Sequence, residues 1–511
     1  MALSRTLAVA LTGLCGQLVE VECDISSGLP GMSFTGHADP SVVESRDRLR
    51  AAVLNSGARW PNSKITVALL PADVRKTGSR FDLALCLAVL AADGQVPAPA
   101  VADAVWIAEL GLTGALRPVR GVLSTVLAAR QHGAERVVVA RANESEAALV
   151  DGVDVRVADD LGSIVSWLTG VGPALDQARA RQPTDPGRGT GPDLVEVAGQ
   201  FAAKRALEVA AAGGHHLYLV GTPGAGKTML AERLPGLLPL LREEESLDVT
   251  AVHSIAGLLP EGARLIDKPP IQAPHHTASV AALVGGGSPI ARPGAISLAH
   301  HGVLFLDEAP EFSPRALEAL RQPLESGQVV LHRSGGAVRY PARFQLVMAA
   351  NPCGCASASN ECTCSSLARR RHQQRLSGPL MDRIDLRVQV EPVSHSDLFQ
   401  VVADRESTAE VAARVAQARH RAAARWADLP WSVNASVPGA VLRCPDWLPP
   451  RTVTKEAERL LEQGSLSARG FDRVLRTAWT LADLHDRPAP TRGDVSEALF
   501  FRTGRAETWA A

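Results

Sequence analysis

Residues 221–228 of this 511-residue chain read Gly221-Thr222-Pro223-Gly224-Ala225-Gly226-Lys227-Thr228. They match the pattern G-x-x-x-x-G-K-[ST] in full, between an apolar run at 217–220 and a helix-forming stretch at 229–234. In such a strand–loop–helix unit the glycines let backbone N–H groups converge on phosphate oxygens at the helix N-terminus. We therefore expect these eight residues to bind ATP, with Lys227 on the β- and γ-phosphates and Thr228 on Mg²⁺.

Polar residues follow two further strand-like runs. The run at 303–306 ends in Asp307 and Glu308, and the run at 344–350 ends in Asn351. We expect Asp307 to bind Mg²⁺ through water, Glu308 to orient or deprotonate the attacking water, and Asn351 to sense the γ-phosphate. Alone, the acidic pair could cap a helix, and Asn351 could open an Asn-Pro turn. Together with the phosphate-binding motif they predict a site for ATP hydrolysis.

Composition sets broad limits. The length predicts roughly two to four domains. Hydrophobic residues make up 46% and charged residues 21%, as in globular proteins, and a net charge of -1 means that nucleic-acid binding would need a local basic patch. No apolar run approaches the roughly 20 residues of a membrane span. Leu14 stands where a signal peptide would need a small residue, so we expect a cytoplasmic protein.

Four of the eight cysteines crowd into twelve residues: Cys353, Cys355, Cys362 and Cys364. The others are scattered singly, which argues against a disulfide framework. Four close thiolates suit a tetrahedral Zn²⁺ ion and leave no open position, so we expect a structural zinc site. The C-x-C spacing is not the usual C-x₂-C, and the alternative is a group of small buried thiols.

Four segments follow from the pattern along the chain. Residues 1–170 alternate strands, at 65–70 and 136–140, with helices such as a buried one at 81–92, and predict an α+β domain. Residues 171–193, rich in Gly, Pro, Arg and Asp, predict a linker. Residues 194–395 predict an α/β core, and residues 396–511 a helical lid.

Four further stretches resemble the magnesium-chelatase-like AAA+ proteins, and more closely their YifB/ComM branch. They are APHHT at 273–277, PGAISLAH at 293–300, AANPC at 349–353 and LSGPLMDRID at 376–385. The resemblance covers nearly the whole chain and implies a P-loop AAA+ core with a helical lid, working as an ATPase in a ring, most simply a hexamer. It also implies a DNA helicase that promotes branch migration during recombination or integration of transforming DNA.

Single residues take their roles from this resemblance. Arg383 resembles the arginine finger that reaches the neighbouring subunit's γ-phosphate, and Arg469 resembles the sensor-2 arginine of the lid. Asn351 resembles sensor 1. Without the resemblance, either arginine would be taken for a solvated surface residue.

Residues 328–340 are typical of a β-hairpin with a Gly-rich turn. In related ring motors such a hairpin projects into the central channel, so we expect His332 and Arg333 near its tip to contact DNA phosphates. The alternative is a solvated hairpin. Residues 268–277 with 285–287 are a second candidate channel element. The basic run at 369–375 is a third candidate for contact with DNA. It could instead face an acidic surface of a neighbouring subunit.

The front segment, 1–170, resembles the Lon-protease-like fold, which can carry a Ser–Lys dyad. Here Arg80 stands at the nucleophile position, beside Ser79, and Leu123 stands where the lysine belongs. A serine without a base partner is not an activated nucleophile. We therefore expect a non-catalytic platform for assembly or substrate.

Three alternatives to a DNA motor stay open. They are a metal-insertion motor of the magnesium-chelatase type, a protein-remodelling motor and an ATP-dependent protease. The front domain and the cysteine cluster argue against the first. The hairpin tip, with His332 and Arg333 rather than aromatic side chains, argues against the second, and Leu123 argues against the third.

Overall fold

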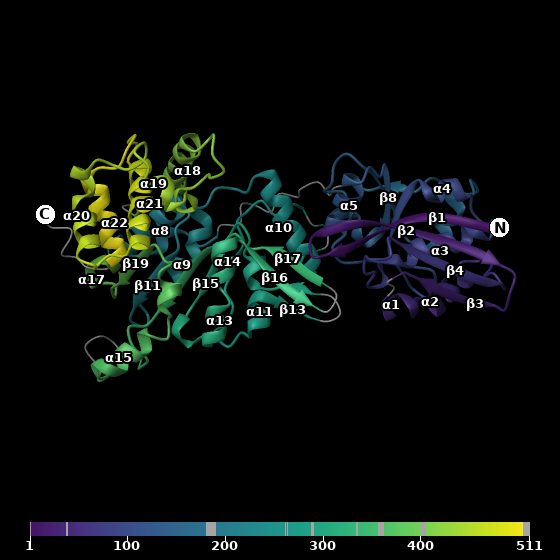
Figure 1. Cartoon of the computed structure of the whole chain (residues 1–511), viewed down its shortest axis with the longest axis horizontal. Coiled ribbons are helices and arrows are strands. Elements are labelled where there is room, and N and C mark those ends of the chain that lie inside the picture. Colours follow the sequence, from purple (N-terminus) through teal and green to yellow (C-terminus); the bar gives the residue numbers. More distant parts are fainter. Residues whose placement is uncertain are drawn as a thin grey trace.

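The computed structural model describes residues 2–36, 39–179, 191–260, 262, 264–287, 291–333, 336–355, 362–399 and 405–503. Two bodies lie end to end along the long axis, the N-terminal one at the right of Figure 1. Residues 180–190 of the predicted linker lie outside the described residues. Among the helices that the structure describes, none is both long and apolar enough to cross a bilayer.

The N-terminal body is built on a mixed eight-stranded sheet, in the order β10-β9-β8-β5-β1-β2-β4-β3. Two apolar clusters cover its two faces, one around the buried helix α3 and the other around α5. Strands β4 and β8 and helix α3 confirm the elements predicted for this segment. The bounds are β1 (Ala2–Thr12), β2 (Cys15–Ser26), β3 (Gly31–Thr35), β4 (Lys64–Leu70), β5 (Ala104–Ile107), β8 (Arg136–Ala140), β9 (Asp154–Ala158) and β10 (Asp176–Gln177), with α1 (Pro40–Val43), α2 (Ser45–Asn55), α3 (Asp82–Ala92), α4 (Ala98–Ala102), α5 (Val122–Gln131), α6 (Glu144–Ala147) and α7 (Leu161–Leu168); the short pair β6 (Glu109–Leu110) and β7 (Leu116–Arg117) stands apart.

The second body contains a five-stranded sheet in the order β12-β15-β18-β11-β19, and every neighbouring pair in it is parallel. The phosphate-binding motif leaves β11 and opens α9, as the sequence predicts. The strands are β11 (Leu217–Gly221), β12 (Ile271–Gln272), β15 (Val303–Leu306), β18 (Gln345–Ala350) and β19 (Leu386–Val390). The helices around them are α8 (Phe201–Gly213), α9 (Lys227–Leu237), α10 (Glu243–Ala256), α11 (Val280–Val284), α12 (Ala295–Leu298), α13 (Pro314–Glu318), α14 (Arg321–Ser326), α15 (Ser366–Gln373), α16 (Gly378–Met381) and α17 (His395–Leu398).

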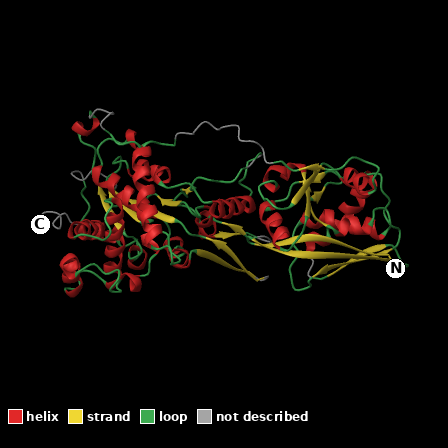
Figure 2. Cartoon of the chain, turned by 90° about the horizontal axis from the view of Figure 1, so that it is seen from above, coloured by secondary structure: helices red, strands yellow, loops and turns green. Residues whose placement is uncertain are grey.

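Two small hairpins stand outside this sheet. One is β13 (Gly285–Gly286) with β14 (Arg292–Pro293). The other is β16 (Gln328–Arg333) with β17 (Gly336–Pro341), which confirms the predicted hairpin. It reaches toward the N-terminal body, as Figure 2 shows.

Among the described residues 405–503, the regular elements are all helical: α18 (Thr408–Arg425), α19 (Gly439–Leu442), α20 (Arg451–Glu462), α21 (Ala468–Leu484) and α22 (Arg492–Thr503). They share one apolar cluster with α8, α9 and one face of the parallel sheet. Trp426 is fully buried among Trp431, Trp447 and Trp479 in this part. The lid therefore packs on the core as a continuous interior rather than as a separate domain.

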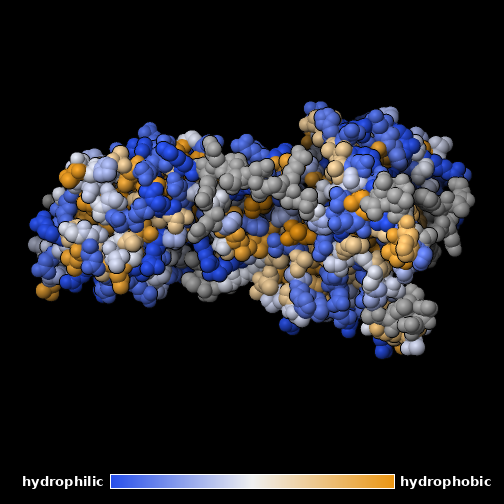
Figure 3. All heavy atoms as spheres, turned by 180° about the vertical axis from the view of Figure 1, so that it is seen from behind, coloured by the Kyte–Doolittle hydropathy of each residue, from blue (hydrophilic) through white to orange (hydrophobic). Residues whose placement is uncertain are grey.

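The two bodies touch through α10 and through the β1–β2 turn. Ala251 of α10 belongs to the apolar cluster around α5, and the Ser254 hydroxyl donates to the Glu146 carboxylate. At the turn, a Cβ on Gly13 would lie 2.7 Å from the carbonyl oxygen of Arg339 in β17, so only glycine fits. In Figure 3 hydrophobic atoms gather at the waist between two mostly hydrophilic bodies.

A buried carboxylate ties the lid to the core. Asp385, just before β19, is 2% exposed, accepts from the backbone N–H of His216 at 3.0 Å and pairs with Arg473 of α21. Burial alone would raise the pKa of Asp385, but Arg473 and the neighbouring histidines hold it well below its usual value. The aspartate is thus ionised and joins the starts of β11 and β19 to the lid.

Asp385→Asn should loosen the lid, because it leaves Arg473 without its buried counter-charge. Breaking a buried pair in this way costs about 3–5 kcal/mol of unfolding free energy. The urea midpoint of tryptophan fluorescence is a suitable readout, since four of the eight tryptophans pack in the lid. Glu456→Gln, which breaks an exposed pair with Arg459, should leave the midpoint unchanged. Equal midpoints for the two variants would contradict the role assigned to Asp385.

Candidate nucleotide site

Lys227 is the first residue of α9, and its side chain is buried at the carboxyl end of β11. The loop before it turns back sharply, with left-handed backbone at Gly224 (φ 76°) and Gly226 (φ 93°). The ammonium group donates to the carbonyls of Gly221 at 2.8 Å and Thr222 at 2.9 Å, and to the Asn351 side-chain oxygen at 3.0 Å. Burial lowers the pKa of Lys227, against the opposing effect of Asp307 and Glu308. The residues that follow β15 and β18 therefore lie close to the Lys227 ammonium group, as the sequence predicts.

Thr228 and Asp307 also meet as predicted. The Thr228 hydroxyl donates to the Asp307 carboxylate at 2.7 Å, which brings a hydroxyl and a carboxylate oxygen to one exposed point beside the loop. Oxygen donors of these two kinds are what Mg²⁺ prefers in a nucleotide site. The donor set therefore fits a magnesium ion between the loop and β15.

Two residues at this site make contacts that were not predicted. The Gln200 amide donates to the carbonyl of Ala225 at 3.0 Å and to that of Glu391 after β19, so it clamps the phosphate-binding loop to a neighbouring strand end. The ring nitrogen Nδ1 of His276 lies 3.2 Å from a carboxylate oxygen of Glu308. The sequence signalled His276 only as part of the stretch APHHT at 273–277, without a link to Glu308.

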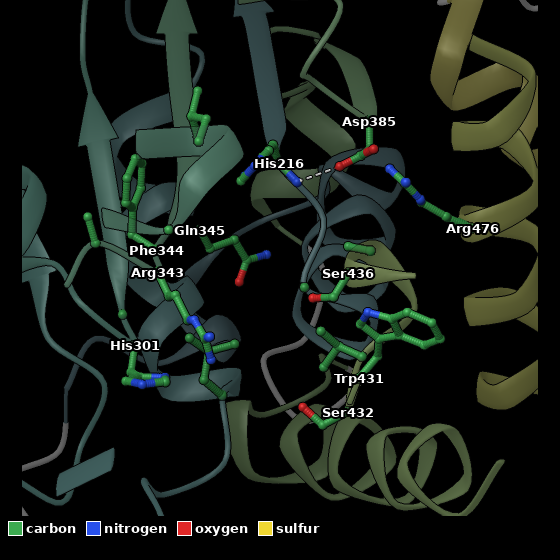
Figure 4. A pocket seen from close by; sticks show the side chains of 18 of the residues that line it. His216, His301, Arg343, Phe344, Gln345, Asp385, Trp431, Ser432, Ser436 and Arg476 are labelled. Carbon is green, nitrogen blue, oxygen red and sulfur yellow. Dashed lines mark hydrogen bonds between the residues drawn. The ribbon is translucent and has the colours of Figure 1, made fainter. Parts of the chain in front are cut away.

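Arg383 and Arg469 lie at the opposite edge of the sheet. Both line a cavity of about 1110 Å³ at the amino ends of the strands, together with Asp385 and Arg476 (Figure 4). Arg383 donates to the Glu325 carboxylate and to the carbonyl of Pro379. The length of β11 separates them from the phosphate-binding loop of the same chain, roughly 15 Å for five residues.

The four cysteines converge. The sulfur of Cys353 lies 2.9 Å from that of Cys355 and 3.3 Å from that of Cys362, and all four sulfurs lie within 4.8 Å of one another. Residues 356–361 between the two pairs lie outside the described residues. Helix α15 follows directly and extends away from the sheet in Figure 1, with the basic residues Arg369, Arg370 and Arg371 exposed. Arg375 instead pairs with Glu311 at 2.7 Å.

The remaining predicted residues are spread over the two bodies. His332 is exposed near the end of β16, whereas the side chain of Arg333 lies outside the described part of the structure. In the N-terminal body, the Ser79 hydroxyl donates to the Glu109 carboxylate. Leu123 is fully buried, and burial lowers the pKa of Arg80 to about 10.

Comparison with known proteins gives three family matches along the chain. The family described as "Magnesium chelatase, subunit ChlI" matches residues 193–398, "Subunit ChlI of Mg-chelatase" matches 21–143, and "Magnesium chelatase, subunit ChlI C-terminal" matches 405–502.

Full-length relatives sharpen the assignment. An uncharacterized protein of Mycobacterium tuberculosis is 52% identical over 98% of this chain and 99% of its own length. YifB of Escherichia coli is 41% identical over 98% of this chain and 97% of its own, and the competence protein ComM of Haemophilus influenzae is 38% identical over 98% of each. The chain therefore belongs to the YifB/ComM family of magnesium-chelatase-like AAA+ ATPases.

Proposed function

We propose that this protein is an ATP-hydrolysing motor that assembles into a hexameric ring and drives branch migration of DNA. The observation that supports a ring assembly is the position of Arg383 and Arg469, which lie at the sheet edge opposite the phosphate-binding loop. Neither guanidinium reaches the nucleotide of its own chain. A second copy placed against this edge supplies the missing positive charge, so each active site is shared between two subunits.

The residues then divide the chemistry of phosphoryl transfer. Lys227 and the loop amides hold the β- and γ-phosphates, and Thr228 and Asp307 hold Mg²⁺, which neutralises charge on the phosphates. Glu308 orients and deprotonates the attacking water, and Asn351 positions it against the γ-phosphate. Arg383 and Arg469 of the adjoining subunit stabilise the charge that develops in the transition state.

The proposal that DNA is the substrate rests on the relatives of this chain and on the hairpin β16–β17. The relative from H. influenzae is named a competence protein, which suits an action on incoming DNA. The hairpin β16–β17 stands outside the sheet and presents His332, with Arg333 next in the chain, as contacts for phosphates. We infer that the Lon-protease-like front body is a non-catalytic platform, since Ser79 is bonded to a carboxylate and has no base partner among the predicted residues.

A second candidate function is a protein-remodelling or magnesium-chelatase-like motor that does not act on DNA. The three chelatase family matches favour it, because they cover both bodies of the chain. The same ATPase chemistry and the same ring serve this alternative equally well. Only the effect of DNA on turnover separates the two.

The cysteine cluster is proposed to bind one structural Zn²⁺. Four thiolates around a zinc ion with bonds of about 2.3 Å lie about 3.8 Å apart, close to the spacing of the sulfurs here. The ion would tie the end of β18 to α15, because Cys353 follows Asn351 by two residues and Cys364 precedes α15. It would have no open position for catalysis.

Protein purified under reducing conditions should contain about one zinc per chain. Cys353→Ser combined with Cys355→Ser should lose the metal, as measured by elemental analysis. Cys444→Ser, which removes an exposed cysteine outside the cluster, should retain it. Wild-type protein without bound zinc would contradict the proposed site.

The shared active site predicts rescue between two inactive variants. Arg383→Ala should lower kcat about 10³-fold or more while ATP still binds. Glu308→Gln should lower kcat by about 10²–10⁴-fold. In a mixed ring, Arg383 of the glutamine variant meets the intact Glu308 of the alanine variant, so a 1:1 mixture should regain ATPase activity. A mixture no more active than its components would contradict a site shared between subunits.

The proposal that this motor acts on DNA is tested by measuring the ATPase rate of the wild type with and without forked or four-way DNA. We expect branched DNA to raise the rate severalfold, because engagement of the hairpins commits the ring to its hydrolysis cycle. Glu308→Gln, which keeps the fold and the binding surfaces, should hydrolyse ATP neither without DNA nor with it. In a strand-displacement assay the wild type should separate the strands and Glu308→Gln should not. Turnover indifferent to every DNA structure tried would favour the protein-remodelling or chelatase-like alternative.

A further inference from the structure

Helix α15 (Ser366–Gln373) is exposed over most of its length. Its residues 366–371 all lie at the surface, and Leu367 remains 55% exposed. A helix of eight residues is too short to be stable in water by itself. It extends away from the sheet in Figure 1, so its position must be fixed at its two ends.

Contacts at both ends anchor the helix. Cys364, two residues before the helix, belongs to the cysteine cluster. At the other end His372 is buried, and a Cβ on Gly354 would lie 3.4 Å from its Nδ1 atom, so the ring packs beside the loop of the same cluster. Just beyond the helix, Arg375 pairs with Glu311 at 2.7 Å. The side of α15 that carries His372 therefore faces the body.

The opposite side of the helix is basic. With 3.6 residues per turn, Leu367, Arg370 and Arg371 share one face, whose centre lies about 150° around the axis from His372. We call these three residues the outer face of α15. Arg369 lies outside it, and its Nε–H donates to a backbone carbonyl before the helix at 3.3 Å. The anchors thus direct two guanidinium groups and an exposed leucine away from the body.

The charge of the outer face is not neutralised nearby. Among the residues that the structure describes, neither Arg370 nor Arg371 forms an ion pair, and residues 362–375 contain four arginines but no Asp or Glu. Like charges held this close repel one another, and an anion bound at this face would relieve the repulsion. The whole chain has a net charge of -1, so the positive charge is concentrated locally.

The composition of this face indicates the kind of anion. An interface between protein subunits usually has an apolar core with charged residues at its rim. Here the residues around Leu367 are Ser366, Ala368 and the arginines, which is too little apolar surface for such a core. Contacts to nucleic acid are instead polar and rich in arginine, and most of them go to phosphates and sugars. The outer face therefore fits a phosphate backbone better than it fits an acidic neighbouring subunit.

We propose that the outer face of α15 is a second nucleic-acid contact of this motor, in which Arg370 and Arg371 bind backbone phosphates of DNA. The inference rests on the proposed function and adds a surface to it. In Figure 1 helix α15 and the hairpin β16–β17 lie at well-separated places on the second body, so they contact different segments of the DNA. A branched molecule offers two such segments at once, because its arms diverge.

The test is the salt dependence of binding to fluorescein-labelled forked DNA, measured by anisotropy in the presence of a non-hydrolysable ATP analogue. Each phosphate contact contributes about 0.7–0.9 to the steepness of log K against log salt concentration. The double variant Arg370→Gln with Arg371→Gln should therefore lower this steepness by about 1.4–1.8 and raise Kd about tenfold or more at about 0.1 M KCl. Glutamine has nearly the helix propensity of arginine, so α15 should remain folded.

Two further variants serve as controls. Arg46→Gln with Arg50→Gln removes two exposed arginines from α2 in the front body and should keep the wild-type salt dependence. Arg333→Gln, in the hairpin, should lower the steepness by about 0.7–0.9, and its effect should add to that of the α15 variant because the two contacts are separate. Sedimentation velocity should show assemblies of wild-type size for every variant.

A wild-type salt dependence and Kd for the α15 double variant would overturn the inference. Loss of the ring in that variant would also overturn it, because the outer face would then bind a neighbouring subunit rather than DNA. Failure of the proposed function gives a different result, since wild-type turnover would ignore DNA. The α15 contact would still stand if the double variant weakens the salt dependence of DNA binding, and it would fall if the wild type binds no DNA.

Discussion

The parallel register of the five-stranded sheet is the constraint on which the rest of this structure depends. Because all neighbouring strands run in the same direction, every carboxyl end meets at one edge and every amino end at the other. Lys227, Asp307 and Asn351 are far apart in sequence, yet they gather at the carboxyl edge without any local pattern that links them. The same geometry places Arg383 at the amino edge, away from the phosphate-binding loop of its own chain.

The lid is part of this arrangement because it holds the amino edge. Arg473 of α21 pairs with Asp385. Arg502 of α22 donates to the carbonyl of Ile384 and pairs with Asp382, the two residues on either side of Arg383. One apolar cluster runs through lid and core, so a rotation of the lid is transmitted to the start of β19. The phosphate-binding loop at one edge and the arginines at the other are therefore joined through one continuous packed unit.

Sequence patterns predicted the parts of the site that local rules determine. The phosphate-binding loop, the acidic pair, Asn351 and the convergence of four cysteines all follow from short motifs whose spacing has a direct chemical meaning. Contacts between residues of different elements had no such signal. Gln200 on Ala225, His276 on Glu308 and Arg473 on Asp385 depend on which elements become neighbours, and a two-residue strand such as β12 is too short for its periodicity to be recognised. The resemblance identified Arg469 but did not predict that it lines the same cavity as Arg383.

The glycine turn at the end of the β1–β2 hairpin has a consequence for how this chain can change over evolutionary time. Gly13 lies against the backbone of Arg339, so the longest hairpin of the front body abuts strand β17 of the hairpin β16–β17. An inserted residue in either segment would push the other out of place, and a side chain at Gly13 would do the same. A change in the length of one hairpin would therefore need a matching change in the other, although some 320 residues separate them in the sequence.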